Sequence, residues 1–171
     1  MVTILRRMLS QSSKAYPVMC TEEVMAAKAH GTTATAVMKD LRFGCDWDTA
    51  DHICSFNRHY AEHAGYAWGP TISWVRECKN LEDGETLTYY DSVSGKPLFE
   101  APKGRTMEHF MQESRAHGWP SFRDDEVVWE NMRCLPNGEA VSVDGTHLGH
   151  NLPDGSGNRY CINLVSIAGY S

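Results

Sequence analysis

Three two-residue turn signals divide the C-terminal third of the chain into short segments, and they constrain the fold more than any other feature. They are Asn137-Gly138, Asp144-Gly145 and Asp154-Gly155, dipeptides that favour tight turns because their residues accept a positive φ. Short runs rich in apolar and β-branched residues lie between them. This pattern predicts antiparallel strands over residues 127–129, 139–143, 146–148 and 159–167.

The N-terminal half favours helices. Residues 48–63 form an amphipathic pattern with Ile53, Phe56 and Tyr60 on one face, Asp48 or Thr49 as N-cap and Gly65 as terminator. Further helical patterns follow Thr21 as far as Gly31, include Val37, Met38 and Leu41, and later include Met107, Phe110 and Met111. Two more strands are predicted, over 71–75 and 85–90, the second followed by a turn at Ser94-Gly95.

Length and charge exclude several classes of protein. The 171 residues fit a single domain, and 16 Lys+Arg against 22 Asp+Glu leave a net charge of −6 with no basic run. We therefore expect no nucleic-acid partner. Because no apolar stretch approaches the roughly 18 residues needed to cross a bilayer, we also expect no membrane insertion.

Residues 1–20 are basic and rich in serine, with no acidic residue before Glu22. This composition is typical of a mitochondrial or plastid transit peptide and equally of an ordinary basic tail. The expected location is mitochondrial or cytoplasmic. Six cysteines at wide, irregular spacing without a Cys-x-x-Cys pair indicate free thiols rather than a disulfide framework.

Cys161 is the candidate nucleophile. Alternation along the last predicted strand places Arg159, Cys161 and Asn163 on one face. The opposite face carries Tyr160, Ile162 and Leu164. An ordinary cysteine is mostly protonated near neutral pH, and a neighbouring guanidinium stabilises the reactive thiolate. A buried structural cysteine is the alternative, and for a lone cysteine it is the better one.

Other chemically active side chains surround Cys161 in the sequence. His147 and His150 precede it, and Asp154 lies between them and the thiol. Taken singly, each histidine is more often a surface or core residue, and Asp154 beside Gly155 is more often a turn former. The two histidines, three residues apart around Gly149, suit no common zinc arrangement.

Four sequence blocks together resemble the methionine-R-sulfoxide reductase B family, also called the SelR domain. They are Gly118-Trp119-Pro120-Ser121-Phe122, His147-Leu148-Gly149-His150, Pro153-Asp154-Gly155 and Arg159-Tyr160-Cys161-Ile162-Asn163. A weaker similarity begins at Ser94-Gly95 and Leu98-Phe99, so the resemblance covers roughly residues 86–168, about half the chain. Residues 1–80 resemble no family.

The resemblance implies a reductase that returns methionine-R-sulfoxide, free or in proteins, to methionine during oxidative damage repair. Cys161 is then the nucleophile and becomes a sulfenic acid. Trp119 receives the substrate methyl group, and Phe122 either packs beside it or belongs to the core. His147, His150 and Asp154 manage the proton, while Arg159 and Asn163 support the thiolate. No cofactor is implied beyond an external thiol such as thioredoxin.

The chain departs from the family pattern at two places. Many members hold zinc with two Cys-x-x-Cys pairs, but here Tyr90 and Val93 occupy the first pair's place and only Cys134 remains of the second. We therefore expect no zinc, with an inserted hairpin after Cys134 in its stead. His117 stands where some members have a resolving cysteine, so thioredoxin-supported turnover is predicted to depend on Cys45 or Cys54, with Cys20 and Cys78 as further candidates.

The sequence thus predicts a mainly β fold of two small antiparallel sheets. A basic segment (1–20) and a helical extension (21–85) precede a reductase-like domain (86–171). The predicted activity is that of a peptide-methionine (R)-S-oxide reductase. Two alternatives stay open: a non-catalytic subunit or adaptor that docks on an assembly partner through residues 1–85, and a metal-binding module built from His147, His150, Cys134 and Cys161.

Overall fold

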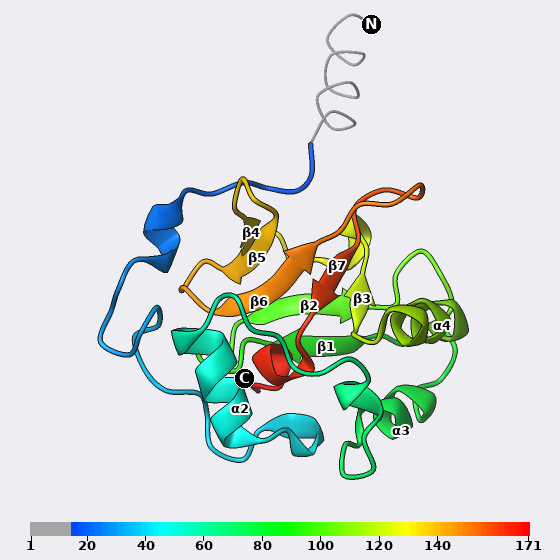
Figure 1. Ribbon diagram of the computed structural model, residues 1–171. Helices are drawn as coiled ribbons and strands as arrows, with labels where there is room; N and C mark the ends of the chain where they lie inside the picture. Colours follow the sequence, from blue (N-terminus) through cyan, green and yellow to red (C-terminus); the bar gives the residue numbers. More distant parts are fainter. Residues whose placement is uncertain (1–14) are drawn as a thin grey trace, which may run out of the picture.

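Two antiparallel sheets form the centre of the molecule (Figure 1). The computed structural model describes residues 15–171, so residues 1–14 of the basic segment, and the targeting role considered for it, lie outside the described residues. The smaller sheet pairs β1 (Leu87–Tyr90) with β2 (Pro97–Ala101). The result agrees with the predicted fold class, a small mainly β protein with few helices.

The larger sheet has the strand order β3-β7-β6-β5-β4. Its strands are β3 (Ser121–Phe122), β4 (Met132–Cys134), β5 (Glu139–Ser142), β6 (His147–Asn151) and β7 (Tyr160–Ile162). The turn signals lie where the sequence predicts them: Gly138 joins β4 to β5 and Gly145 joins β5 to β6, with φ of 94° and 92°. The hairpin predicted after Cys134 is therefore present.

Two predicted strands are wrong and one is too long. Residues 71–75 pair with no strand; helix α3 (Trp74–Lys79) begins there and buries Trp74 and Cys78, which lie one helical turn apart. Of residues 127–129, only Val127 forms a bridge, to Phe99. β7 ends at Ile162, and residues 164–167 turn into a 3-10 helix, η6 (Leu164–Ile167), rather than extending the sheet.

The predicted helix over 48–63 is much shorter. Asp46, not Asp48 or Thr49, caps α2 (Trp47–Asp51) by accepting the Thr49 N–H at 2.9 Å. A π-helical turn, η3 (His52–Phe56), follows, and the helix ends at Asn57. Ile53 is buried, but the predicted face is wrong because Phe56 and Tyr60 are 55% and 53% exposed.

The other short helical patterns have different outcomes. The pattern after Thr21 yields only a 3-10 turn, η1 (Glu22–Met25), and residues 37–41 are irregular before η2 (Arg42–Gly44). A further 3-10 turn, η4 (Tyr66–Trp68), follows Gly65, which caps its N-terminus rather than ending a helix. The predicted helix with Phe110 is confirmed as α4 (Met107–His117), and η5 (Asp124–Glu126) follows β3.

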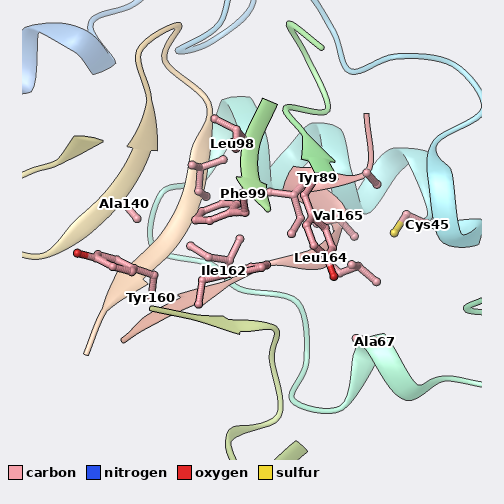
Figure 2. Close-up of a cluster of buried hydrophobic side chains, with 14 of the residues drawn as sticks. Cys45, Ala67, Tyr89, Leu98, Phe99, Ala140, Tyr160, Ile162, Leu164 and Val165 are labelled. Carbon is pink, nitrogen blue, oxygen red and sulfur yellow. The ribbon is translucent and has the colours of Figure 1, made fainter. Parts of the chain in front are cut away.

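One continuous hydrophobic core joins the extension, residues 21–85, to the C-terminal part of the chain, residues 86–171. The extension contributes Phe43, Ile53 and Trp74, and Trp74 donates its indole N–H to the Tyr89 hydroxyl of β1 at 2.8 Å. Figure 2 shows Cys45 and Ala67 of the extension around the same cluster as Phe99, Ile162 and Val165. Residues 21–85 are thus packed into the domain, although most of them are irregular rather than helical.

The first described residues run along the edge strand β4. Met19 forms a parallel bridge with Cys134, the Cys20 N–H donates to the Cys134 carbonyl at 2.9 Å, and Tyr16 stacks on Trp129 with ring centroids 4.8 Å apart. This segment satisfies backbone groups that an open sheet edge would expose. Among the described residues, no helix has the length and apolar character needed to span a bilayer.

Candidate active site

A β-bulge in β6 brings the two predicted histidines to the same side of the sheet. β5 pairs Glu139 with His150 and Val141 with His147, so that Leu148 is an extra residue in the register. In a regular strand, residues three apart point to opposite faces. The extra residue removes that alternation. Both histidines therefore line one cavity, while Leu148 is fully buried in the core.

Cys161 lies on the neighbouring strand β7, directly opposite His150 in the register. Its Sγ accepts a hydrogen bond from Arg159 Nη1 at 3.0 Å, and the Ser121 hydroxyl lies 3.8 Å away. Tyr160 and Ile162 point into the core, which confirms the predicted alternation. The Arg159 guanidinium thus places a positive charge directly against the sulfur. Cys161 itself remains partly exposed.

The cavity has a volume of about 370 Å³, within the usual range for small-molecule sites. Five predicted residues line it: Trp119, His147, His150, Cys161 and Asn163. A thiol, two imidazoles and an apolar indole therefore share one space. The remaining wall includes residues that the sequence did not indicate: Arg58, His59, Tyr60 and Ala61 from the extension, and Asn137 and Glu139 from the β4–β5 hairpin.

The extension segment 57–62 is fastened to the site by buried hydrogen bonds. Asn163 Oδ1 accepts the Glu62 N–H at 2.9 Å, while Asn163 Nδ2 donates to the Leu148 carbonyl at 3.0 Å. The Glu62 carbonyl accepts the indole N–H of Trp119 at 3.1 Å. Asn163 therefore links β6 to the extension at the cavity. The same segment fixes the orientation of Trp119.

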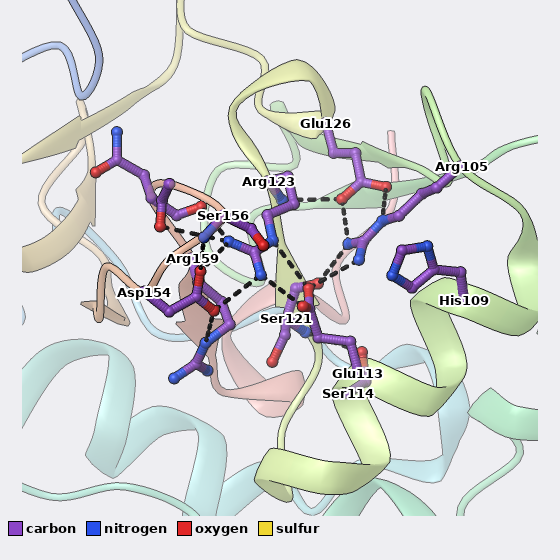
Figure 3. A network of polar contacts seen from close by, with 12 residues as sticks. Arg105, His109, Glu113, Ser114, Ser121, Arg123, Glu126, Asp154, Ser156 and Arg159 are labelled. Atoms are coloured by element: carbon purple, nitrogen blue, oxygen red, sulfur yellow. Dashed lines mark hydrogen bonds and ion pairs between the residues drawn. The ribbon is translucent and has the colours of Figure 1, made fainter.

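Asp154 does not line the cavity. Its carboxylate pairs with Arg123 at 2.9 Å and lies 3.6 Å from Arg159 Nε (Figure 3). The hydrogen bonds from Arg123 are the main reason why the pKa of Asp154 falls to about 2. An ionised carboxylate outside the cavity is not a proton donor near neutral pH, so the predicted proton-handling role of Asp154 is not supported. Its position suits holding Arg159 against Cys161.

The ion pairs continue beyond Asp154 to helix α4. Arg123 also binds Glu113 at 2.5 Å, and Glu113 binds Arg105 at 2.8 Å (Figure 3). Burial acts to raise the pKa of Glu113, but the hydrogen bonds from Arg123 and Arg105 outweigh it and lower the pKa. Glu113 and Asp154 therefore stay ionised, and the ion pairs anchor the turn that carries Asp154.

His147 has a carboxylate partner that the sequence analysis missed. Its Nδ1 lies 2.8 Å from Glu139 Oε2, and both side chains are about 6% exposed. Glu139 also receives hydrogen bonds from Arg58 Nε and Nη2, the shorter at 2.7 Å. Arg58 pairs with Glu22 as well. The turn at Asn137-Gly138 was the available signal for the strand that carries Glu139, whereas nothing in the sequence marked Arg58.

Phe122 belongs to the core. It is fully buried and stacks on Phe99 with ring centroids 4.2 Å apart, at an interplanar angle of 15°. Of the two roles considered for it, the core role is therefore correct. The aromatic side chains in the cavity wall include those of Trp119 and Tyr60.

The other cysteines are poorly placed to resolve a sulfenic acid. All six lie within residues 15–171, and Cys45, Cys54, Cys78 and Cys134 are buried. Burial raises the pKa of Cys78 and Cys134 to about 12 and raises those of Cys45 and Cys54 strongly. Thiols of this kind are unreactive. The structure thus weighs against the predicted role of Cys45 or Cys54, and Cys20 is the remaining partly exposed thiol.

A buried hydrogen bond joins the β1–β2 turn to the β5–β6 turn. Asp91, in the β1–β2 turn, accepts the Thr146 hydroxyl at 2.9 and 3.0 Å, and it also accepts the Val93 N–H at 2.8 Å. Burial raises the pKa of Asp91 even though these hydrogen bonds oppose the shift. Within residues 15–171, no three His, Cys, Asp or Glu side chains are placed to hold a metal ion.

No known family model matches the chain. The chemistry of the site follows from its geometry: a partly exposed thiol held by a guanidinium shares one cavity with the imidazoles of His59, His147 and His150 and with an apolar wall. This set can attack an electrophilic sulfur or carbon and transfer a proton to a departing oxygen.

Proposed function

We propose that the protein reduces methionine-R-sulfoxide to methionine, with Cys161 as the nucleophile. The observation that carries the proposal is the 3.0 Å contact between Arg159 and the Cys161 sulfur in a cavity that Trp119, His147 and His150 also line. Three of the four blocks that resemble the reductase B family contribute residues to the cavity wall, and the fourth contributes Asp154, which lies 3.6 Å from Arg159 Nε. We also propose that the two sheets belong to that family's fold.

The reaction balances as a transfer of oxygen between two sulfur atoms. The Cys161 thiolate attacks the sulfoxide sulfur, and an imidazole supplies a proton to the sulfoxide oxygen. Methionine leaves with two more electrons, and Cys161 becomes a sulfenic acid. One external thiol then forms a mixed disulfide with Cys161 and releases water, and a second thiol restores Cys161. Thioredoxin or a similar dithiol is the proposed reductant.

Trp119 suits the proposed substrate because its indole presents an apolar face beside the thiol. A methyl group placed against it would leave the sulfoxide oxygen toward the histidines. Such an arrangement distinguishes R from S sulfoxides, because the opposite configuration exchanges the positions of the oxygen and the lone pair.

The test is an assay of R- and S-methionine sulfoxide, each free and in a peptide, with dithiothreitol as reductant. We expect turnover of the R form only, and we expect Cys161→Ser to abolish it while leaving the circular dichroism spectrum unchanged. Cys20→Ser is the matched control and retains dithiothreitol-driven activity. Turnover in Cys161→Ser, or no turnover of either form by the wild-type protein, contradicts the proposal and favours a non-catalytic adaptor.

A further inference from the structure

We propose that Glu139 and Arg58 are positioning residues that hold the His147 imidazole in one tautomer, with Nε2 directed to the reacting group. This inference rests on the proposed function and adds to it two residues outside the blocks that resemble the reductase family. Glu139 lies in the hairpin after Cys134, and Arg58 lies in the extension.

The protonation of Glu139 determines which nitrogen of His147 carries hydrogen. Burial acts to raise the pKa of Glu139, but hydrogen bonds from His147 and Arg58 outweigh it and lower the pKa below its usual value. An ionised carboxylate only accepts hydrogen bonds. His147 Nδ1 must therefore donate in the 2.8 Å contact, which leaves Nε2 as the nitrogen that can exchange a proton.

The position of Nε2 follows from the same contact. The ring lines the cavity, and Nδ1 is engaged on the Glu139 side. Within residues 15–171, Nε2 has no hydrogen-bond partner in the protein, so it is available to a ligand. His150 differs, because it is exposed and makes no side-chain hydrogen bond in the same described range. His147 is the imidazole with a fixed orientation.

Arg58 in turn fixes Glu139. Its Nε and Nη2 bind both carboxylate oxygens, at 3.1 Å to Oε2 and 2.7 Å to Oε1, and the remaining Nη1 pairs with Glu22. A paired arrangement of this kind restricts rotation of the carboxylate more than a single contact does. A nucleophile, a histidine and a carboxylate that orients the histidine form a recurrent catalytic arrangement.

The experiment compares Glu139→Gln and Arg58→Met with the wild-type protein, and Glu130→Gln serves as an exposed matched control. Three quantities are measured: steady-state reduction of a peptide R-sulfoxide, alkylation of Cys161 by iodoacetamide, and the imidazole tautomers by 15N NMR. The His147→Gln variant assigns the His147 signals. His30, whose Nε2 contacts Asp51 at 2.9 Å, gives an internal reference for the opposite tautomer.

We expect Glu139→Gln to lower kcat by about 10- to 100-fold, because a correctly placed acid–base group contributes roughly 10²–10⁴-fold. KM and the alkylation rate stay within about twofold, and the Nδ1–H signal of His147 is lost. Arg58→Met gives a smaller decrease of the same kind. The alkylation rate also reports whether each variant has folded with an intact cavity.

An unchanged tautomer, or an unchanged kcat in Glu139→Gln, would overturn the inference. Equal losses of reduction and alkylation would also overturn it, because they would place the effect on the thiol or on the fold. If the wild-type protein reduces no sulfoxide, the proposed function fails and the role in reduction fails with it. The NMR signal of His147 would still show whether Glu139 fixes the tautomer, so the two failures are distinguishable.

Discussion

Trp119 donates its indole N–H to the main-chain carbonyl of Glu62, at 3.1 Å, and thereby joins the C-terminal part of the chain to the extension. Glu62 itself is 2% exposed. Its N–H donates to Asn163 Oδ1, and its carboxyl accepts the Val165 N–H. Glu62 therefore makes hydrogen bonds to Trp119, Asn163 and Val165. The cavity wall therefore depends on a segment that carries no recognisable motif.

The first prediction concerns the buried carboxyl of Glu62. Burial raises its pKa from about 4.5 to about 8, and Oε2 has no partner within the described residues. The folded state therefore holds this proton more tightly than the unfolded state. This contribution to stability is complete below about pH 4.5 and is lost as the pH rises through about 8.

Glu62→Gln should remove this loss of stability at high pH. We expect the variant and the wild-type protein to have similar free energies of unfolding near pH 5. At pH 8.5 the variant should be more stable, by an amount on the order of a few kcal/mol. Urea unfolding at pH 5, 7 and 8.5 measures the difference, with Glu130→Gln as the exposed control. A difference independent of pH would contradict the prediction.

The second prediction concerns Arg159. Arg159→Met removes the hydrogen bond to the Cys161 sulfur but keeps much of the side-chain volume. A hydrogen bond to a charged group contributes about 1.5–3 kcal/mol, so alkylation of Cys161 at pH 7 should slow by roughly 10- to 100-fold. Iodoacetamide labelling followed by mass spectrometry gives the rate. Arg76→Met, at an exposed arginine on α3, should alkylate like wild type, and an unaffected Arg159→Met rate would refute the role of Arg159.

The third prediction separates the apolar wall that Trp119 provides from its hydrogen bond to Glu62. Trp119→Phe keeps an apolar wall and loses the hydrogen bond to Glu62, whereas Trp119→Ala loses both. Because an apolar contact with one or two carbons is worth about 1–3 kcal/mol, Trp119→Ala should lower kcat/KM for the R-sulfoxide by roughly 10- to 200-fold. Trp119→Phe should lower it much less. Equal losses in both variants would show that the hydrogen bond, not the apolar wall, matters.

The fourth prediction concerns the loops joined by Asp91 and Thr146. Thr146→Val leaves a buried carboxyl without one of its partners and should lower the free energy of unfolding by about 1–3 kcal/mol. Added zinc should not restore the free energy of unfolding, since we predict no stoichiometric zinc in the purified protein. Denaturant unfolding and elemental analysis test both points. Thr35→Val, at an exposed threonine, is the matched control, and one zinc per chain would contradict the prediction.

The fifth prediction concerns the reducing thiol. Because Cys45 and Cys54 are buried, their serine variants should support thioredoxin-driven and dithiothreitol-driven turnover at an unchanged ratio. Cys20→Ser is the informative variant, since Cys20 is the other partly exposed cysteine. A selective loss of thioredoxin-driven turnover in Cys20→Ser would identify it as the resolving thiol. Such a loss in Cys45→Ser or Cys54→Ser instead would require the extension to open.

The sequence predicted the site better where strand alternation and turn residues decide the structure than in the extension. The faces of β7 followed directly from alternation around Cys161, and Gly138 and Gly145 lie in the predicted turns. In the extension, tertiary contacts overrode local pattern. The segment after Phe56 leaves the helix, and there Glu62 binds Asn163 and Arg58 binds Glu139. These partners are 101 and 81 residues away, and no periodicity within residues 48–63 reports them.

The bulge in β6 has a consequence for how this sequence tolerates change. Because Leu148 is an extra residue in the register, the two imidazoles share one side of the sheet although they are three residues apart. A Cβ added at Gly149 would lie 2.0 Å from the main-chain carbonyl oxygen of Cys161. Substitution of Gly149 is therefore the change to which this stretch is least tolerant, because any side chain there would push β6 away from the strand that carries the thiol.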